Sequence, residues 1–319
     1  MFTSSIESWL SEIVRIKVKP STYDGYEYRF RRYIKPFFIN RIVEEVTSKD
    51  IQEFVSTLVH EKTKLPLSPT TIHGIVNLVS DFYDYCLTKD LVDKNPCLQV
   101  TLPKRKQKKV VVLNNREQKV ILKELQDRCD SKAHLVLVAL YTGMRLGELC
   151  SLRWEYIDLK NRIIVVKTSK RRIKNNDKNK IEKFSNAKVK KTREVITSPK
   201  TDDSEREIPI ASVLLQVFEQ QSALESEYVF PKKNGKRYDN RSLQQFFSEC
   251  TRKSGIKGKS FHSLRHTFAT MAIESKMDVK TLSIILGHSN VNTTLNLYVH
   301  PNEKYIRESM EVLATYIAK

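Results

Sequence analysis

The stretch Phe261-His262-Ser263-Leu264-Arg265-His266 says most about how this chain folds and which chemistry it carries. Leu286-Gly287-His288 and Tyr298 follow it, and four of the seven histidines fall between positions 262 and 300. His262 and Arg265 are three residues apart, which places them on one face of a helix. A guanidinium, several imidazoles and a phenol in so short a segment suit phosphoryl transfer through a covalent tyrosine intermediate.

The composition of the whole chain points to a polyphosphate partner. The 319 residues carry a formal net charge of +19 at pH 7, and a hydrophobic content of 40% is enough for folded cores. No stretch approaches the roughly 18 consecutive apolar residues of a membrane span, and the first residues lack the layout of a signal peptide. The five cysteines are scattered without a CxxC pair, so neither a disulfide framework nor a zinc site is expected. The protein is expected to act in a reducing cytoplasm.

The first hundred residues predict four helices with short connections, which make a compact bundle. The second helix begins at Pro20, the third is capped by the segment 47–50, and the fourth opens at Ser68-Pro69. The apolar positions at helical spacing are Ile6, Trp9, Leu10, Ile13 and Val14; Tyr26, Phe30, Tyr33 and Ile34; Ile51, Phe54, Val55 and Leu58; and Ile72, Ile75, Val76, Val79 and Phe82.

A domain boundary is expected after Asn95-Pro96. We place a helical domain at 1–103, a basic linker at 104–112 and a second domain at 113–319. A proline-led run of cations marks the linker: Lys104, Arg105, Lys106, Lys108 and Lys109. Such a run is either a solvated connection or a segment that follows a phosphate backbone. Residues 110–113 have a β-like pattern, and Asn114 to Glu117 resembles the cap of the next helix.

The second domain is predicted to be mixed. Ala133 to Tyr141 is apolar on nearly all sides and predicts a buried helix that ends at Thr142-Gly143. Arg145 follows, with Glu148 three residues beyond it. Two interpretations stay open, because Glu148 can simply neutralise Arg145, or the glycine turn can aim the guanidinium into a cleft.

Three short strands are predicted after that helix, at 163–166, 193–196 and 207–210, forming one small sheet whose turn carries Ser198 to Thr201. The segment 167–193 lies between the first two strands and holds twelve cations against two acids. It is interpreted either as a mobile or hairpin-like insertion or as solvated disorder. Lys170, Arg171 and Arg172 are its candidate DNA contacts.

Taken together, these motifs resemble the tyrosine recombinases, and phage and conjugative-transposon integrases in particular. The resemblance covers essentially the whole chain, and the residues that carry it are Thr142 to Leu149, Pro199-Lys200-Thr201 with Arg206 and Pro209, His262 with Arg265, Leu286-Gly287-His288 and Tyr298. It implies a mainly α fold with a small β-sheet, in which an N-terminal four-helix core-binding (SAM-like) domain precedes a mixed α/β catalytic domain. Such integrases often carry an arm-binding domain in front; its absence here would mean a removed segment or a simpler member.

The resemblance also implies a nucleophile and a base. Tyr298 would attack the scissile phosphate, giving a 3′-phosphotyrosine and a free 5′-hydroxyl. Because a phenol has a pKa of about 10, it needs a base and nearby positive charge. His262 would accept its proton.

The remaining roles concern the charge of the phosphate. Arg145 and Arg265 would make bidentate hydrogen bonds to its non-bridging oxygens, and His288 would donate a hydrogen bond to the same phosphate. Lys200 would protonate the departing 5′-oxygen. Glu148 would steady Arg145 without touching the phosphate. Neither ATP nor a metal ion is implied, and the sequence has no Walker loop or clustered carboxylates.

The implied partner is double-stranded DNA, with the protein acting in the bacterial cytoplasm at the nucleoid and not at a membrane. Strand exchange joins two duplexes, so we expect a monomer or weak oligomer in solution and a homotetramer on paired sites, with DNA-bending accessory or excisionase proteins as possible partners. The segment 302–319 predicts a C-terminal helix with an apolar stripe. That stripe packs either on its own domain or on a neighbouring protomer, and it consists of Ile306, Met310, Leu313 and Ile317.

Three other protein classes fit the composition. A type IB topoisomerase uses similar residues but relaxes DNA without exchanging strands, and the contexts around Arg145 and His288 favour a recombinase. A binding-only repressor or architectural protein has no need of all six polar residues. A nuclease would be expected to show metal-binding acids, which the sequence does not cluster.

Overall fold

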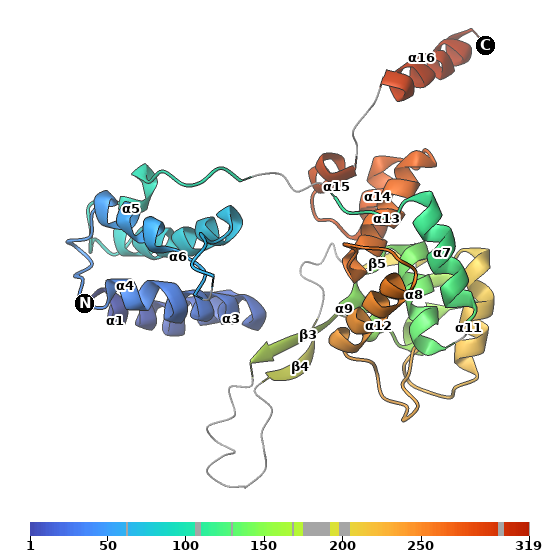
Figure 1. Cartoon of the computed structure of the whole chain (residues 1–319), viewed down its shortest axis with the longest axis horizontal. Coiled ribbons are helices and arrows are strands. Elements are labelled where there is room, and N and C mark those ends of the chain that lie inside the picture. The colour runs from blue at the N-terminus through green and yellow to red at the C-terminus, as the bar shows by residue number, and fades with distance from the viewer. Residues whose placement is uncertain are drawn as a thin grey trace. The chain divides into compact units, whose positions relative to one another are not determined.

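Figure 1 shows the computed structural model of the chain, which describes residues 1–61, 63–105, 110–128, 130–167, 169–174, 192–197, 205–298 and 303–318. The chain divides into two compact units. The first consists of Met1–Lys108 with Arg172–Glu194, and the second of Lys109–Arg171 with Val195–Lys319.

The first unit is a helical bundle, as the sequence predicts. Helices α1 and α2 join through a π-helical segment into one rod, and α3 and α4 do the same. The bounds are α1 Phe2–Trp9, π-segment Leu10–Val14, α2 Arg15–Lys17, α3 Pro20–Arg29, π-segment Phe30–Ile34, α4 Lys35–Phe38, α5 Ser48–Thr57, α6 Pro69–Leu87 and a 3-10 turn at Pro96–Gln99.

Local signals fix where these helices start. Thr47 caps α5 through a reciprocal box with Asp50, and Ser68 accepts the N–H of Thr71 at the start of α6. Inside the bundle, Phe2 stacks on Phe38 with ring centroids 4.5 Å apart, and both rings are fully buried. Capped amphipathic helices closing on one aromatic core account for the bundle.

The second unit holds most of the remaining helices and a small sheet. The bounds are α7 Asn115–Gln126, α8 Ser131–Thr142, α9 Leu146–Cys150, β1 Ile157–Asp158, β2 Ile163–Val166, β5 Arg206–Pro209, α11 Leu215–Ser222, α12 Asn240–Lys253, α13 Phe261–Glu274, α14 Val279–Leu286, α15 Val291–Tyr298 and α16 Glu303–Ile317, with 3-10 turns at Trp154–Tyr156 and Ser212–Leu214. Helix α8 is buried on nearly all sides, which confirms the prediction. Asn114 caps α7 in a box with Glu117, also as predicted.

The sheet differs from the prediction. Its strands are antiparallel in the order β1-β2-β5, and Ile164 lies opposite Ile208. The predicted strand at 193–196 is β4 (Thr192–Thr197). It pairs with β3 (Ser169–Lys174) in a separate two-stranded sheet. The sequence predicted one sheet, whereas the structure has two. Strand β1 has only two residues, too few to give a pattern. Strands β3 and β4 pair near the two ends of the insertion, and 175–191 lie outside the described residues.

The β-like stretch at 110–113 was predicted wrongly, because residues 110–114 form no strand. Side chains bind its backbone groups instead of a neighbouring strand. The Leu113 N–H donates to Thr267 Oγ1 at 2.8 Å, and the Val112 carbonyl accepts from Lys259 Nζ at 2.6 Å. Leu113 itself is buried in the core of the second unit, whereas Val111 is 44% exposed.

Over the described residues, no helix has both the length and the apolar character that crossing a membrane requires. The same part of the chain brings together no group of three or more His, Cys, Asp or Glu side chains suited to a metal ion.

Candidate active site

A glycine turn brings α8 close to two other helices. Gly143 ends α8 with φ of +63°, a left-handed conformation, and its N–H donates to Ala139 O at 3.0 Å. A β-carbon at this position would lie 2.5 Å from a ring carbon of Phe268 on α13 and 2.9 Å from a methyl of Leu286 on α14. Both the turn and the close approach require glycine, and they set Arg145 at the start of α9.

The Leu-Gly-His motif is the C-terminal cap of α14. Gly287 has φ of +64° and donates to Ile284 O at 2.9 Å, while His288 N–H donates to Ser283 O at 3.1 Å. This pair of bonds is a Schellman motif, in which a glycine takes the left-handed position. The backbone of His288 is therefore fixed to the end of α14.

Three arginines bind the three carbonyls that this cap leaves open. The pairs are Arg206 Nε with Ile285 O at 2.6 Å, Arg265 Nη2 with Leu286 O at 2.7 Å, and Arg145 Nη2 with Gly287 O at 2.9 Å. Carbonyls at a helix C-terminus lack intrahelical partners and carry the negative end of the helix dipole, so they favour cations. The end of α14 thus organises the three guanidiniums.

Glu148 neutralises part of this charge from inside the fold. It is 3% exposed, and its two carboxylate oxygens pair with Arg145 Nη1 and with Arg206 Nη2, each at 2.9 Å. Burial alone would raise the pKa of Glu148, but the charges of Arg206 and Arg145 outweigh it and hold the pKa below its ordinary value. The predicted Glu148–Arg145 pair is confirmed. The Arg145 side chain remains 38% exposed, so part of it is accessible from outside the fold.

Arg206 is the residue that the sequence reasoning missed, since it was quoted as part of a motif without a role. It is 6% exposed and lies on β5, where burial alternates along the strand. The signal was present in the sequence, because positions 206 and 208 face the same side of a strand and 208 is a core isoleucine. An arginine in that register needs an internal carboxylate, which is Glu148.

We predict that Glu148→Gln lowers the free energy of unfolding of the second unit by about 3–5 kcal/mol, because it leaves two guanidiniums without their buried counter-charge. The chain has two tryptophans, with Trp9 in the first unit and Trp154 in the second. Urea unfolding followed by Trp154 fluorescence in a Trp9→Phe background therefore reports on the second unit.

The matched control is Glu155→Gln. This carboxylate is 56% exposed and pairs with Arg153 at 3.3 Å, so its loss should change stability by less than about 0.5 kcal/mol. Equal effects of the two substitutions would contradict the view that Glu148 supports the arginine cluster.

Helix α13 supplies the His262–Arg265 pair that the sequence singles out. The helix begins with a capping box between Ser260 and Ser263. Arg265 is 3% exposed and also donates through Nη1 to Gly143 O at 2.9 Å, whereas the His262 side chain is only partly covered. Desolvation of the ring, followed by the charges of Arg265 and Arg145, lowers the pKa of His262. A neutral imidazole at neutral pH can accept a proton.

His288 lies beside the same charges. Burial first, and then the charges of Arg265, Arg145 and Arg206, lower the pKa of His288 to about 4. The ring is therefore neutral at neutral pH. Its Nδ1 is hydrogen-bonded to Thr294 Oγ1 at 2.8 Å.

The structure thus brings Arg145, Glu148, His262, Arg265 and His288 into one site at the end of α14. The other predicted residues are placed less fully. The backbone of Tyr298 ends α15, which packs on α14 and α13, but its side chain lies outside the described residues. Lys200 lies outside them altogether.

The same holds for most predicted DNA contacts. Lys104 and Arg105 are exposed, and the positions 106, 108 and 109 lie outside the described residues. Lys170, Arg171 and Arg172 belong to β3, but their side chains are not among those described.

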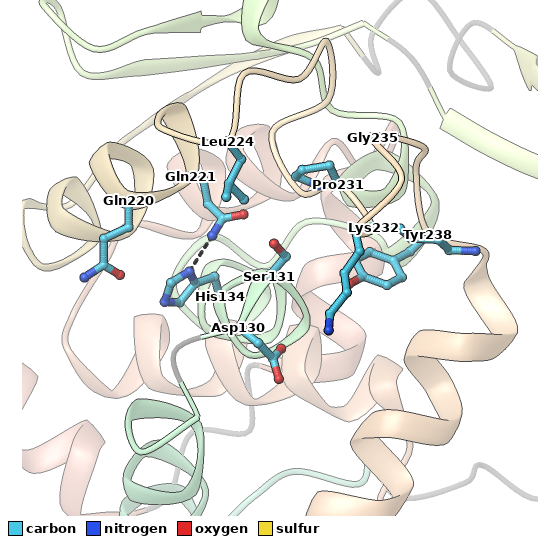
Figure 2. Close-up of a pocket in the computed structure, with 11 residues that line it drawn as sticks. Asp130, Ser131, His134, Gln220, Gln221, Leu224, Pro231, Lys232, Gly235 and Tyr238 are labelled. Carbon is cyan, nitrogen blue, oxygen red and sulfur yellow. Dashed lines mark hydrogen bonds between the residues drawn. The ribbon is translucent and has the colours of Figure 1, made fainter.

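A pocket with a volume of about 500 Å³ lies at the start of α8, lined by Asp130, Ser131 and His134. Figure 2 shows these residues around it. None of the predicted site residues lines it. His134 and Gln221 are bonded at 2.7 Å and both are buried, so this contact joins α8 to α11. Burial lowers the pKa of His134. We assign this pair to packing.

Comparison with known proteins agrees with this geometry. The model of the Phage integrase family matches residues 111–305, and that of the phage integrase N-terminal SAM-like domain matches residues 1–59. The first match alone covers more than half of the chain. This chain therefore belongs to the phage integrase family, the tyrosine recombinases.

Individual relatives cover nearly the whole chain. A tyrosine recombinase XerC-like protein of Caldanaerobacter subterraneus subsp. tengcongensis is 28% identical, over 97% of this chain and 81% of its own length. The ICEBs1 integrase of Bacillus subtilis is 25% identical, over 91% and 77%. The predicted family is confirmed.

Solved structures share the fold. The Tn1549 transposon integrase in complex with a circular intermediate DNA matches with a TM-score of 0.75 and 22% identity, over 97% of this chain and 99% of that one. A lambda integrase tetramer bound to a Holliday junction matches with a TM-score of 0.68 and 16% identity, over 91% and 77%. The predicted fold class, a SAM-like helical domain before a mixed catalytic domain, is confirmed.

Proposed function

We propose that this chain is a DNA strand-exchange recombinase that cleaves and rejoins DNA through a 3′-phosphotyrosine to integrate and excise a mobile element. One observation carries the proposal. Arg145, Arg265, His262 and His288 converge on the end of α14, where burial and the arginine charges lower the pKa of both histidines, and the next helix, α15, ends at a tyrosine. Relatives named as an integrase of ICEBs1 and as a Tn1549 transposon integrase with circular intermediate DNA support a mobile element as the cargo.

In the first step the Tyr298 oxygen attacks the scissile phosphorus while His262 accepts the phenolic proton. The bond from phosphorus to the 5′-oxygen breaks, and Lys200 gives that oxygen a proton. A 3′-phosphotyrosine and a 5′-hydroxyl result. Attack by a 5′-hydroxyl of another strand reverses the step and frees Tyr298, so the energy of the phosphodiester is conserved and no ATP is consumed.

The arginines lower the barrier by meeting the charge that develops on the phosphate. The Arg145 side chain is 38% exposed, and its guanidinium is held by Glu148 and Gly287 O. Arg265 is fixed by two carbonyls. Donors that are already in place need no reorganisation during the reaction, which is the source of this kind of stabilisation. His288 adds a neutral donor to the same phosphate.

Double-stranded DNA is the partner, and the working assembly is a homotetramer on paired sites. Two duplexes exchange strands through four breaks, one for each tyrosine, and the lambda integrase tetramer on a Holliday junction shares this fold. DNA-bending or excisionase proteins assist, and the reaction takes place in the bacterial cytoplasm at the nucleoid.

The basic linker is expected to contact phosphates. Changing five cations to Gln should weaken binding to all DNA sequences alike and flatten the log–log salt dependence by about 0.9 for each lost phosphate contact; the positions are Lys104, Arg105, Lys106, Lys108 and Lys109. Exchanging Lys for Arg and Arg for Lys at the same positions keeps the charge and should keep the slope. An unchanged slope in the Gln variant would show that the linker is only solvated.

The C-terminal helix α16 is expected to dock on a neighbouring protomer. Its apolar positions Met310, Leu313 and Ile317 are 60%, 48% and 74% exposed, so they remain available for a partner; Ile306 is not among the described side chains. Deleting all residues after Pro301 should impair assembly and cleavage on two-ended DNA more than binding to a single site. Native gels and cleavage assays on the two substrates measure the difference.

A substitution test avoids the truncation. Changing Met310, Leu313 and Ile317 to Ala should reproduce the assembly defect, whereas Glu311→Ala with Thr315→Ala, on the opposite face of the helix, should not. Full recombination by the triple variant would leave the helix as local packing.

Strand exchange itself separates this proposal from its alternatives. Two labelled duplexes carrying the element ends are incubated with the protein in EDTA without ATP. The proposal predicts recombinant products of exchanged label. Relaxation of supercoiled plasmid without exchange would indicate a topoisomerase, and binding without any covalent adduct would indicate an architectural protein.

A further inference from the structure

We propose that Thr294 is a positioning residue, which fixes the ring of His288 and places its proton on Nε2, so that this nitrogen donates to the scissile phosphate. The inference deepens the proposed function and rests on it in one respect, namely that His288 contacts the phosphate. No motif in the sequence singled out Thr294.

The backbone of His288 is fixed, but its ring needs a separate constraint. The Schellman cap of α14 holds the His288 N–H on Ser283 O. Rotation about the side-chain bonds remains, and a ring hydrogen bond is what usually selects one orientation. The contact from Thr294 Oγ1 to His288 Nδ1, at 2.8 Å, supplies it. It links the end of α14 to α15, the helix that carries Tyr298.

Burial makes this contact informative. Thr294 is 0% exposed, while its neighbour Thr293 is exposed. A buried hydroxyl must place its hydrogen on an acceptor. In the part of the chain that the structure describes, His288 Nδ1 is the hydrogen-bond partner of Thr294 Oγ1, and no other is found. The hydroxyl therefore donates and Nδ1 accepts.

The position of the proton follows. Burial and the neighbouring arginines hold the pKa of His288 at about 4, so the ring carries a single N–H at neutral pH. If Nδ1 is the acceptor, that N–H is on Nε2. A ring with the opposite tautomer would turn a lone pair toward a phosphate oxygen and repel it. One hydroxyl thus decides whether His288 attracts or repels the substrate.

Nitrogen NMR of histidine-labelled protein tests the tautomer without DNA, with His288→Gln used to assign the signal. Wild type is expected to show a pyrrole-like Nε2 and a pyridine-like Nδ1 at position 288. Thr294→Val keeps the branched shape and removes the donor, so it should give a mixed or altered tautomer, whereas Thr294→Ser should keep the wild-type pattern. A protonated Nδ1 in the wild type would overturn the proposal.

Cleavage of a suicide substrate tests the consequence. Loss of one positioning hydrogen bond should slow single-turnover cleavage by Thr294→Val about tenfold, with Thr294→Ser close to wild type. Thr293→Val makes the same change on the exposed side of α15 and should leave the rate unchanged. Melting temperatures show whether each variant is folded. If Thr294→Val is unfolded, the cleavage rate of Thr294→Ser decides whether the hydroxyl has the positioning role.

The two proposals fail in different ways. Wild-type protein that forms no covalent adduct would overturn the recombinase function, while the NMR result still decides the tautomer. Normal adduct formation by Thr294→Val would overturn the positioning role and leave the recombinase function intact.

Discussion

Tyr298→Phe is expected to abolish covalent attachment to DNA while leaving DNA affinity nearly unchanged. The substitution removes the attacking oxygen and almost none of the side-chain area. Neither the arginines, which are not nucleophiles at neutral pH, nor His262, which acts as the base, would replace it. Denaturing gels of a nicked suicide substrate measure the adduct, and a mobility shift of an intact site measures binding.

Tyr305→Phe is the matched control. Tyr305 lies in α16, seven positions after Tyr298, and is the nearest competing phenol along the chain. Its loss should leave the adduct yield unchanged. An undiminished yield in Tyr298→Phe, or a lost yield in Tyr305→Phe, would move the nucleophile to the other tyrosine.

Arg145→Lys is expected to reduce the cleavage rate by roughly 10²–10³-fold, the usual effect of removing one oxyanion donor. The positive charge stays, but an ammonium cannot reach Glu148, Gly287 O and a phosphate in the fixed plane of a guanidinium. DNA affinity should change only a few-fold, because one phosphate contact among many is altered. Single-turnover cleavage separates the two effects.

Arg153→Lys controls for the chemical change. Arg153 pairs with Glu155 and Glu227 at 3.3 and 2.7 Å and lies outside the arginine cluster. This variant should cleave at the wild-type rate. Equal activity of Arg145→Lys and wild type would mean that charge alone, and not forked geometry, stabilises the transition state.

Local sequence signals were sufficient for most of the fold. Thr47 with Asp50, Ser68 with Pro69 and Asn114 with Glu117 start their helices where the sequence indicates, because capping depends on residues within one turn. Strand pairing was harder, since β4 pairs with β3 and the short β1 takes the place beside β2. Pairing partners are chosen by tertiary packing, which a periodic pattern does not encode.

In the site, too, local features could be predicted from the sequence and tertiary contacts could not. Spacing alone puts His262 and Arg265 on one face of α13. What the sequence could not supply is the set of acceptors, because Ile285, Leu286 and Gly287 act through backbone carbonyls that any residue possesses. Arg206 was missed for a related reason, as its partner Glu148 lies 58 positions away and meets it only in the folded core.

Peptide mapping of a trapped protein–DNA adduct tests the recombinase account most directly. A suicide substrate is cleaved in EDTA without ATP, the DNA is trimmed with nuclease, and the linked peptide is identified by mass spectrometry. The account predicts one modified peptide, with Tyr298 joined to a 3′-phosphate, and a free 5′-hydroxyl on the released strand. An adduct on another residue, a linkage to a 5′-phosphate, or cleavage without any adduct would contradict it.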